Sequence, residues 1–325
     1  MQSASDAERV GWVARVELRA IKSEEISDGF SVVRMPTNVE HLLEYYTKAG
    51  PDYEMWSKKF NMHFGYYQRG MDPLDLEGML DKMNREVIRH LALDTCSSQS
   101  ILDMGCGLGA TARYAASAMN NVRVYGVTIV PWQVQRAIEL TNTAIASRRA
   151  MFVLADYTAT PFRANTFDGV YALESSCYAP GYSKEPLLQE AYRILKPGKR
   201  LVVADAFLKT ARRMGPLTRA CYKAICSNWS LETLGNINHV AACLRRLGFM
   251  DVRVANISRN VAPSILHIPL AASRFLKKSL FANPSDASSK QWGNVLACIL
   301  LLAFVVDRRR SGYFIVSCTK PPSCS

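Results

Sequence analysis

The stretch that decides the fold reads ILDMGCGLG and runs from Ile101 to Gly109. Four residues typical of a buried strand lead into glycines at positions 105, 107 and 109, and a helical pattern follows from Ala110 to about Met119. Glycines at the end of a strand let the backbone turn sharply and approach a ligand at the positive end of the next helix. The stretch therefore predicts a strand, a glycine loop and a helix that together bind a small molecule.

Strands alternate with helices beyond this loop. Short apolar runs at residues 122–128, 150–155, 167–173 and 200–204 are separated by helical stretches, and residues 209–247 read as a long helical segment. Two last strands are expected near 252–254 and 312–318, with a second insertion at about 257–306 between them. This alternation is typical of a doubly wound, parallel α/β sheet. On the N-terminal side, residues 39–90 show helical spacing.

Composition and charge limit the function classes. Of the 325 residues, 49% are hydrophobic and 21% charged, a balance typical of a globular chain. The 40 Lys and Arg against 28 Asp and Glu give a net charge of +12, which favours nucleic acid, an anionic membrane or a phosphorylated small molecule as partner. The nine cysteines include no CxxC pair, so we predict neither a disulfide framework nor a metal site.

Two segments bear on location. The first 25 residues contain no apolar stretch long enough for a signal-peptide core, so a reducing, cytoplasmic setting is expected. The longest apolar run, Val295 to Val306, is shorter than the about 20 residues that span a bilayer. It precedes Arg308 to Arg310, so it reads either as a core helix with a solvated basic end or as a helix that lies against a lipid surface.

The glycine loop alone leaves its ligand open. Gly105, Gly107 and Ala110 fit a dinucleotide template loosely. Asp103, two residues before the first glycine, suits a sulfonium or ammonium better than a pyrophosphate, and Thr128 stands where an acidic residue would bind a ribose. These two residues favour S-adenosylmethionine over a dinucleotide, with a purely structural turn as the third interpretation.

Several phrases of the sequence together carry a family resemblance. Residues 101–109, the pair Ala155-Asp156, the phrase at 160–168 and Leu195-Lys196-Pro197-Gly198 resemble the class I S-adenosylmethionine-dependent methyltransferases over residues 100–206. Within that class, residues 126–129 and 170–180 are similar to the sterol C-methyltransferase branch and its relatives that act on tocopherols and terpenoids.

The resemblance implies an architecture and a cofactor. The expected fold is α/β, a doubly wound, mostly parallel seven-stranded sheet of the Rossmann-like methyltransferase type. It has an N-terminal arm at 1–37, a helical cover at 38–95, an S-adenosylmethionine-binding core at 96–206, and acceptor-binding helical insertions with the last strands at 207–325. The cofactor-binding residues implied are Asp103, Gly105, Gly107 and Gly109 for the methionine and ribose parts, Thr128, Ile129 and Gln133 around the ribose and adenine, and Asp156 with Tyr157 at the adenine amino group. From the residues alone, Asp156 also reads as a helix N-cap and Gln133 as a solvated helix residue.

Glu174 is the first candidate for catalysis. It ends the fourth strand, where ligand-facing groups gather in doubly wound sheets. Attack on a methyl group by an alkene carbon leaves a carbocation, which needs nearby negative charge or aromatic faces and then a base. Glu174 suits both roles, His63 is the other candidate base, and either side chain also reads as structural. The substrate-binding candidates are Tyr45, Tyr46, Trp56, Phe64, Tyr66, Cys177, Tyr178 and Trp229.

The acceptor itself stays open. Tyr53-Glu54-Met55-Trp56 replaces the longer aromatic motif of the sterol members, which puts a sterol in doubt. A group of basic residues follows the fifth expected strand and consists of Lys209, Arg212, Arg213 and Arg219. It suits a diphosphate or is simply a solvated face. The sequence thus predicts a C-methyltransferase that acts on a double bond of an apolar, isoprenoid-derived acceptor: a prenyl diphosphate, a sterol or a related terpenoid.

Two alternatives remain. One is N- or O-methylation of a small aromatic, alkaloid or quinol, and the other is a basic protein that binds nucleic acid or membrane through a vestigial cofactor fold. No RNA-binding signature interleaves the basic residues, so no nucleic-acid partner is predicted. The sequence is compatible with peripheral contact with a membrane and with a homo-oligomer.

Overall fold

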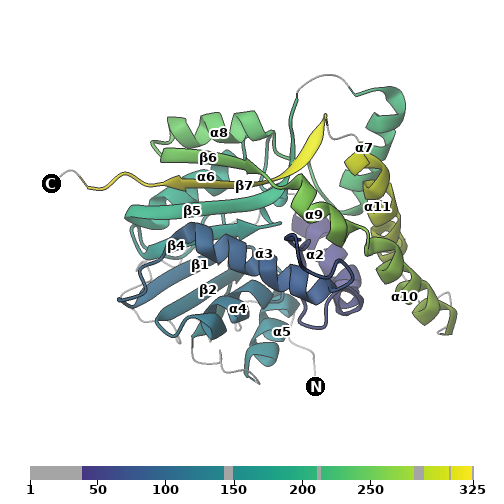
Figure 1. Ribbon diagram of the computed structural model, residues 1–325, viewed down its shortest axis with the longest axis horizontal. Helices are drawn as coiled ribbons and strands as arrows, with labels where there is room; N and C mark the ends of the chain where they lie inside the picture. Colours follow the sequence, from purple (N-terminus) through teal and green to yellow (C-terminus); the bar gives the residue numbers. More distant parts are fainter. Residues whose placement is uncertain (1–38, 143–148, 211–213, 282–288, 307–308, 324–325) are drawn as a thin grey trace, which may run out of the picture.

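The computed structural model describes residues 39–142, 149–210, 214–281, 289–306 and 309–323. The expected N-terminal arm at 1–37 lies outside the described residues. The centre of the molecule is one sheet of seven strands in the order β3-β2-β1-β4-β5-β7-β6 (Figure 1). Strand β7 runs antiparallel to both of its neighbours, β5 and β6. The expected mostly parallel, seven-stranded sheet is confirmed. Its strands are β1 (Gln99–Met104), β2 (Val122–Thr128), β3 (Ala150–Leu154), β4 (Phe167–Leu173), β5 (Leu195–Leu208), β6 (Met250–Asn256) and β7 (Ser311–Thr319).

Successive residues of the strands pack on opposite faces of the sheet. Ile101 of β1 belongs to a core with helices α3 (Leu76–Leu91), α4 (Ala110–Ala118) and α5 (Pro131–Asn142). Its neighbour Leu102 belongs to a second core with α6 (Glu185–Ile194) and α8 (Ile237–Arg246). Both residues are fully buried, as expected for the period of two in a strand covered on both sides.

The fifth strand is longer than the expected run at 200–204. It extends from Leu195 to Leu208, because β7 pairs with its residues from Arg200 to Leu208 and because Leu195 at its start pairs with Phe167 of β4. The expected helical segment at 209–247 is also corrected. It consists of α7 (Pro216–Asn228) and α8, and Asn236 begins the second helix by accepting hydrogen bonds from the backbone amides of Asn238 and His239.

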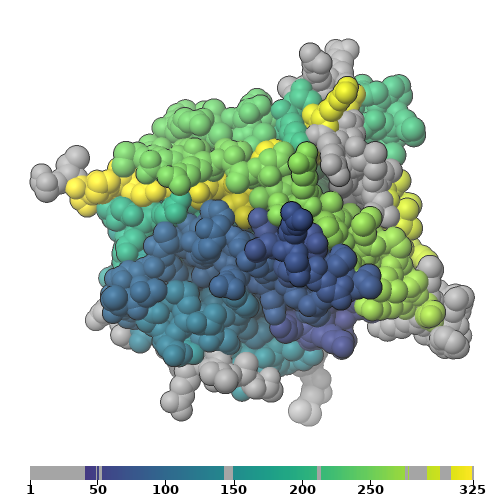
Figure 2. Space-filling view, in the orientation of Figure 1, coloured from purple at the N-terminus to yellow at the C-terminus, as the bar shows by residue number. Residues whose placement is uncertain are grey.

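A cap of helices covers the carboxyl ends of the parallel strands (Figure 1). It contains α2 (Val39–Ala49), the 3-10 helix η2 (Gly50–Met55), α9 (Ser258–Ile265), α10 (Ile268–Phe281) and α11 (Ser289–Val306), together with α7. The helical cover expected at 39–90 is helical only at its two ends, because the part between η2 and α3 is mostly irregular. Figure 2 shows α10 and the segment before α3 meeting in one surface. Within the described ranges, no helix combines the length and apolar character needed to span a bilayer.

Candidate active site

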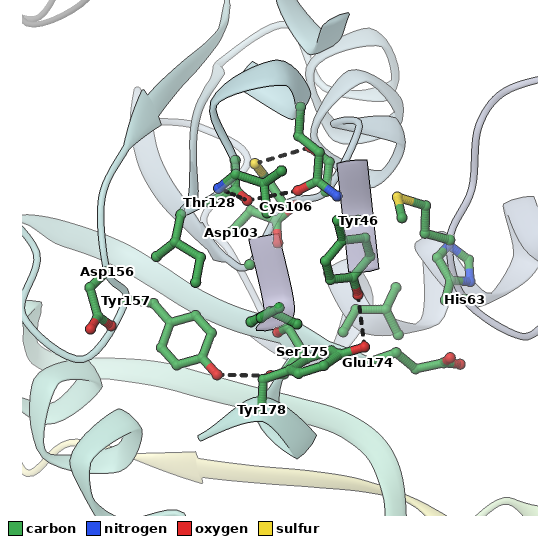
Figure 3. Close-up of a pocket in the computed structure, with 18 of the residues that line it drawn as sticks. Tyr46, His63, Asp103, Cys106, Thr128, Asp156, Tyr157, Glu174, Ser175 and Tyr178 are labelled. Atoms are coloured by element: carbon green, nitrogen blue, oxygen red, sulfur yellow. Dashed lines mark hydrogen bonds between the residues drawn. The ribbon is translucent and has the colours of Figure 1, made fainter. Parts of the chain in front are cut away.

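Two adjoining cavities lie beneath the cap. We call the first the glycine-loop cavity and the second the aromatic cavity, and their empty volumes, with openings included, are about 1360 and 1220 Å³. Both are large enough for a small organic ligand. They share one wall, which is formed by Tyr46, Met62, His63, Glu174 and Tyr178. Ligands in the two cavities would therefore meet at this wall, of which Figure 3 labels Tyr46, His63, Glu174 and Tyr178.

The loop after β1 forms the floor of the glycine-loop cavity. The φ angles of Gly105 and Gly107 are +90° and +51°, and the backbone amides of Gly105 and Cys106 both donate to the carbonyl of Val127. A Cβ atom at Gly105 would stand 2.4 Å from the Cβ of Ser175. A side chain therefore has no room at Gly105, and the bare backbone borders the cavity.

Gly109 does not line this cavity, which corrects the role expected for it. It begins α4 with a φ of +75°, and a Cβ there would lie 2.5 Å from the ring of Phe152 and 3.3 Å from Ala137. The first two glycines of the loop face the ligand space, whereas the third allows α4 to pack against the sheet. The described lining includes Ala110 and Thr111 instead.

A buried carboxyl group stands at the end of β1. Asp103 is 3% exposed, lines the glycine-loop cavity, and its Oδ2 accepts a 2.9 Å hydrogen bond from the hydroxyl of Tyr171. Burial raises the pKa of this carboxyl to about 7, and the Tyr171 hydrogen bond lowers it only in part. A positively charged ligand group would stabilise the ionised form.

Polar side chains from the next two strands face the same space. The hydroxyl of Thr128 donates to Oε1 of Gln133 at 2.8 Å, and both side chains are buried, so Gln133 is not a solvated helix residue. Ile129 also lines the cavity. Asp156 lines it while its Oδ1 accepts from the backbone amide and the hydroxyl of Thr158, which ends the strand in a tight turn.

This set of groups suits a long ligand with a cationic end. Tyr157 lies beside Asp156 and donates its hydroxyl to the carbonyl of Ser175 (Figure 3). Acceptor oxygens of Asp103 and Asp156 therefore stand at separate places along the cavity, with hydroxyl and amide groups between them. An ammonium, a ribose and an aromatic amine are groups that such side chains can bind.

Glu174 occupies the common wall. Its φ of +49° is unusual for a residue other than glycine and is typical of strained positions at functional sites. Its Oε1 accepts two hydrogen bonds of 2.7 Å, from the Phe64 amide and from the Tyr313 hydroxyl. The pKa of Glu174 is raised to about 8, chiefly by burial; the Phe64 amide and the Tyr313 hydroxyl lower it, and the carboxyl of Asp205 adds to the rise.

Aromatic rings surround the aromatic cavity. Tyr46 donates to the hydroxyl of Tyr178 at 2.9 Å, and their ring centroids are 5.8 Å apart, so the two phenols form one unit of the common wall. Helices α10 and α11 add apolar side chains on the opposite side. The aromatic residues of the lining are Tyr46, Tyr53, Trp56, Phe64, Tyr178, Trp229 and Tyr313. Such faces stabilise a cation and also exclude water.

Two aromatic residues expected in the acceptor site lie elsewhere. Tyr45 is fully buried behind the wall and donates its hydroxyl to Asn294 of α11, because adjacent residues of a helix point in different directions. The backbone amide of Tyr66 bonds to the Met79 carbonyl as the chain turns away along α3, and its side chain lines neither cavity. The other six candidates do line one or both cavities: Tyr46, Trp56, Phe64, Cys177, Tyr178 and Trp229.

His63 lines both cavities, but its ring is held by polar neighbours. Its Nδ1 is 2.9 Å from the carbonyl oxygen of Phe64, and its Nε2 is 2.9 Å from Oδ1 of Asn84 and 3.1 Å from Oδ1 of Asn61. Burial lowers the pKa of the imidazole to about 4. Acceptor oxygens therefore stand at both ring nitrogens, and these contacts hold the ring and its loop in place and leave neither nitrogen available to take a proton from a ligand.

The basic group that follows β5 in the sequence contributes no described residue to the lining of either cavity. Lys209 and Arg219 line neither cavity, and Arg212 and Arg213 lie outside the described residues. The part of the aromatic cavity wall that the structure describes includes the carboxyl of Asp205 besides Glu174, and no Lys or Arg.

Sequence reasoning missed residues at and beside the common wall. Met62 is part of that wall, whereas Tyr313 of β7 and Asp205, from the extension of β5, line the aromatic cavity. The signal for Tyr313 was its place at the start of an expected strand, but its neighbours follow from the antiparallel pairing of β7 with β5. That pairing joins segments more than 100 residues apart in the sequence.

Comparisons with known proteins agree with this geometry. Residues 101–198 match the family model described as a methyltransferase domain. An O-methyltransferase, cnsE, from Penicillium expansum is 30% identical over 203 residues, which are 62% of this chain and 70% of that protein. Cycloartenol-C-24-methyltransferase from Arabidopsis thaliana is 35% identical over 158 residues, which are 48% of this chain and 44% of that protein.

A solved structure shares the whole architecture. Geranyl diphosphate C-methyltransferase from Streptomyces coelicolor A3(2) superimposes with a TM-score of 0.68 over 89% of this chain and 100% of that chain. The sequence identity is 13%, so the likeness concerns the fold.

Proposed function

Because this chain belongs to the class I S-adenosylmethionine-dependent methyltransferases, we propose that it methylates a carbon of a double bond in an apolar, isoprenoid-derived acceptor. The family and its cofactor are the premise, and the acceptor chemistry is the proposal. The observation that carries it is the position of Glu174: a partly buried carboxyl at the wall between a cofactor-sized cavity and an aromatic one.

The glycine-loop cavity would hold the cofactor. Bound S-adenosylmethionine supplies an electrophilic methyl group. Asp103 would accept from the cationic methionine end beside Gly105 and Gly107, and Asp156 would accept from the adenine amino group. Thr128, Ile129 and Gln133 would flank the ribose and adenine, and Tyr157 would lie beside the adenine. The raised pKa of Asp103 is consistent with a site that awaits a positive charge.

The aromatic cavity would hold the acceptor with its double bond at the common wall. The methyl carbon would pass from the sulfonium sulfur, which would keep the electron pair of the broken bond, to one carbon of the alkene, and the neighbouring alkene carbon would become cationic. The rings of Tyr46, Tyr178 and Tyr313 would stabilise that charge, and Glu174 would take a proton from the adjacent carbon so that a new double bond forms. A cation beside Glu174 lowers the pKa of its carboxyl, which makes the carboxylate available when it is needed.

We favour Glu174 over His63 as the base because the imidazole nitrogens are already bonded to Phe64 and Asn84. We also favour an acceptor whose reacting end carries no phosphate, because the described wall of the aromatic cavity has two carboxyls and no Lys or Arg. The cover at 38–95 and the insertions within 207–325 would then select the acceptor.

Methylation of a heteroatom is the second candidate, and the O-methyltransferase relative favours it. The substitution Glu174→Gln separates the two. For carbon methylation we expect turnover to fall by about a thousandfold, while titration shows unchanged S-adenosylmethionine binding. Turnover close to that of the wild type would exclude Glu174 as the base and favour the second candidate.

A further inference from the structure

Helices α10 and α11 have two different faces. Their inner faces close the aromatic cavity through Ile268, Ala271 and Ala272 of α10 and through Asn294, Val295 and Cys298 of α11. Asn294 also fixes α11 to the rest of the cap, since it accepts hydrogen bonds from Tyr45 and Trp229. These helices are therefore one wall between the cavity and the outside of the molecule.

The outer face of α11 carries large apolar side chains in a stripe. Trp292, Leu296 and Ile299 are 40%, 49% and 50% exposed, and their spacing of four and three residues places them on one side of the helix. Leu270 of α10 is 50% exposed as well. Single exposed apolar residues are common, but a stripe on a helix whose other face lines an apolar cavity marks an interaction surface.

The charge around this stripe indicates what it contacts. From residue 258 to the end, the sequence has nine Lys and Arg and only two Asp, so this stretch supplies more than half of the net charge of +12. On α10, Arg274 and Lys277 are exposed at four and seven residues from Leu270, on the same side of the helix. Apolar residues bordered by basic ones fit the surface of an anionic bilayer.

We propose that the outer faces of α10 and α11 form a docking surface for an anionic lipid bilayer. Leu270, Leu296 and Ile299 insert among the lipid chains, while Arg274 and Lys277 contact the head groups. An apolar acceptor dissolved in the bilayer then has only the wall of these two helices between it and the aromatic cavity. This short path for the acceptor rests on the proposed function, whereas the docking to the bilayer does not depend on it.

The test is the binding of the full chain to vesicles, measured by flotation without cofactor or acceptor. We expect binding to phosphatidylcholine vesicles that contain phosphatidylserine, weaker binding without phosphatidylserine, and release as salt rises. The double variant Leu296→Asp, Ile299→Asp should bind at least about tenfold more weakly. Its S-adenosylmethionine affinity, measured in parallel, reports that the variant is folded.

The matched control is the double variant Met250→Asp, Val254→Asp, which places the same two charges at residues that are 45% and 41% exposed on β6, the edge strand of the sheet. It should bind vesicles as the wild type does. Equal vesicle binding by the wild type and the double variant would overturn the proposal, as would a wild type that does not bind. A lipid-free dimer that the double variant abolishes would assign the stripe to a second copy of the chain instead. A wild type that binds vesicles but methylates no isoprenoid-derived acceptor would contradict the proposed function alone.

Discussion

The hydroxyl of Tyr313 donates a 2.7 Å hydrogen bond to Oε1 of Glu174, although the two residues are 139 positions apart. The bond joins the last strand of the sheet to the wall between the two cavities. Because it favours the ionised carboxyl, it lowers a pKa that burial raises to about 8. Tyr313 thus lowers the proton affinity of the residue that we propose as the base.

The substitution Tyr313→Phe removes this hydrogen bond and should raise the pKa of Glu174 further. For a carboxylate base, activity rises as pH passes through the pKa of the carboxyl. We therefore expect the ascending limb of the pH–rate profile, near pH 8 in the wild type, to move to higher pH, with a turnover about tenfold lower at neutral pH. Tyr45→Phe is the control, because it removes a buried hydroxyl outside both cavities. If the ascending limb of Tyr313→Phe lies at the same pH as that of the wild type, the limb does not report the titration of Glu174.

The substitution Asp103→Asn should weaken cofactor binding by about 10- to 100-fold, the loss expected when a hydrogen bond to a charged group is removed. In the wild type, affinity should increase as pH rises through about 7, since the carboxylate binds the cationic ligand. Isothermal titration at several pH values measures both effects. Asp81→Asn, which removes the partner of Lys59 on the outer side of α3, should leave the affinity unchanged. A pH-independent affinity in the wild type would contradict the role of Asp103.

The same residue makes the cofactor-free protein sensitive to pH. Its pKa is raised on folding from the usual value of 3.8 to about 7, so its contribution to stability is present below the lower value and is lost as pH rises through the upper one. The variant Asp103→Asn does not lose this stability as pH rises, because the amide does not titrate. Its free energy of unfolding relative to the wild type should therefore improve between pH 4 and pH 8, by about 4 kcal/mol. Denaturation curves measured at several pH values give this difference in unfolding free energy, and a difference that does not change with pH would rule the prediction out.

The substitution His63→Asn should lower stability more than it alters catalysis. It disturbs a buried network with Asn61 and Asn84, which we expect to cost about 1 to 3 kcal/mol in the free energy of unfolding. The limb near pH 8 should remain. A folded His63→Asn protein without that limb, or with turnover reduced about a thousandfold, would make His63 the base in place of Glu174.

The substitution Gly109→Ala should destabilise the fold, because the new Cβ meets Phe152 at 2.5 Å in a left-handed backbone. Gly198→Ala is a matched control, since its φ is nearly the same at +76° and a Cβ there meets nothing within 4 Å. Thermal unfolding should show a loss of about 1 kcal/mol for Gly198→Ala from backbone strain alone. The loss for Gly109→Ala should be at least about 3 kcal/mol. Equal losses would mean that the contact with Phe152 relaxes freely.

Local patterns predicted most of the sheet and the family. The run at 101–109, the alternating strands and the short phrases after them are continuous in sequence, so the fold and the cofactor class followed from them. The limits of β5 did not, because its extension depends on pairing with β7. The choice between Tyr45 and Tyr46 depends on how α2 is rotated against α11, which no local pattern states. Gly109 has the spacing of its two neighbours, yet its contacts with Phe152 and Ala137 give it a packing role.

The most direct measurement is the position of the methyl group in the product. The chain is incubated with carbon-13-labelled S-adenosylmethionine and a panel of sterols, prenyl alcohols, prenyl diphosphates and prenylated quinols, and the product is identified by mass spectrometry and NMR. We predict a labelled methyl bonded to carbon, next to a double bond that has moved or formed anew, in an acceptor that carries no phosphate at its reacting end. A labelled methyl on oxygen or nitrogen would contradict the account.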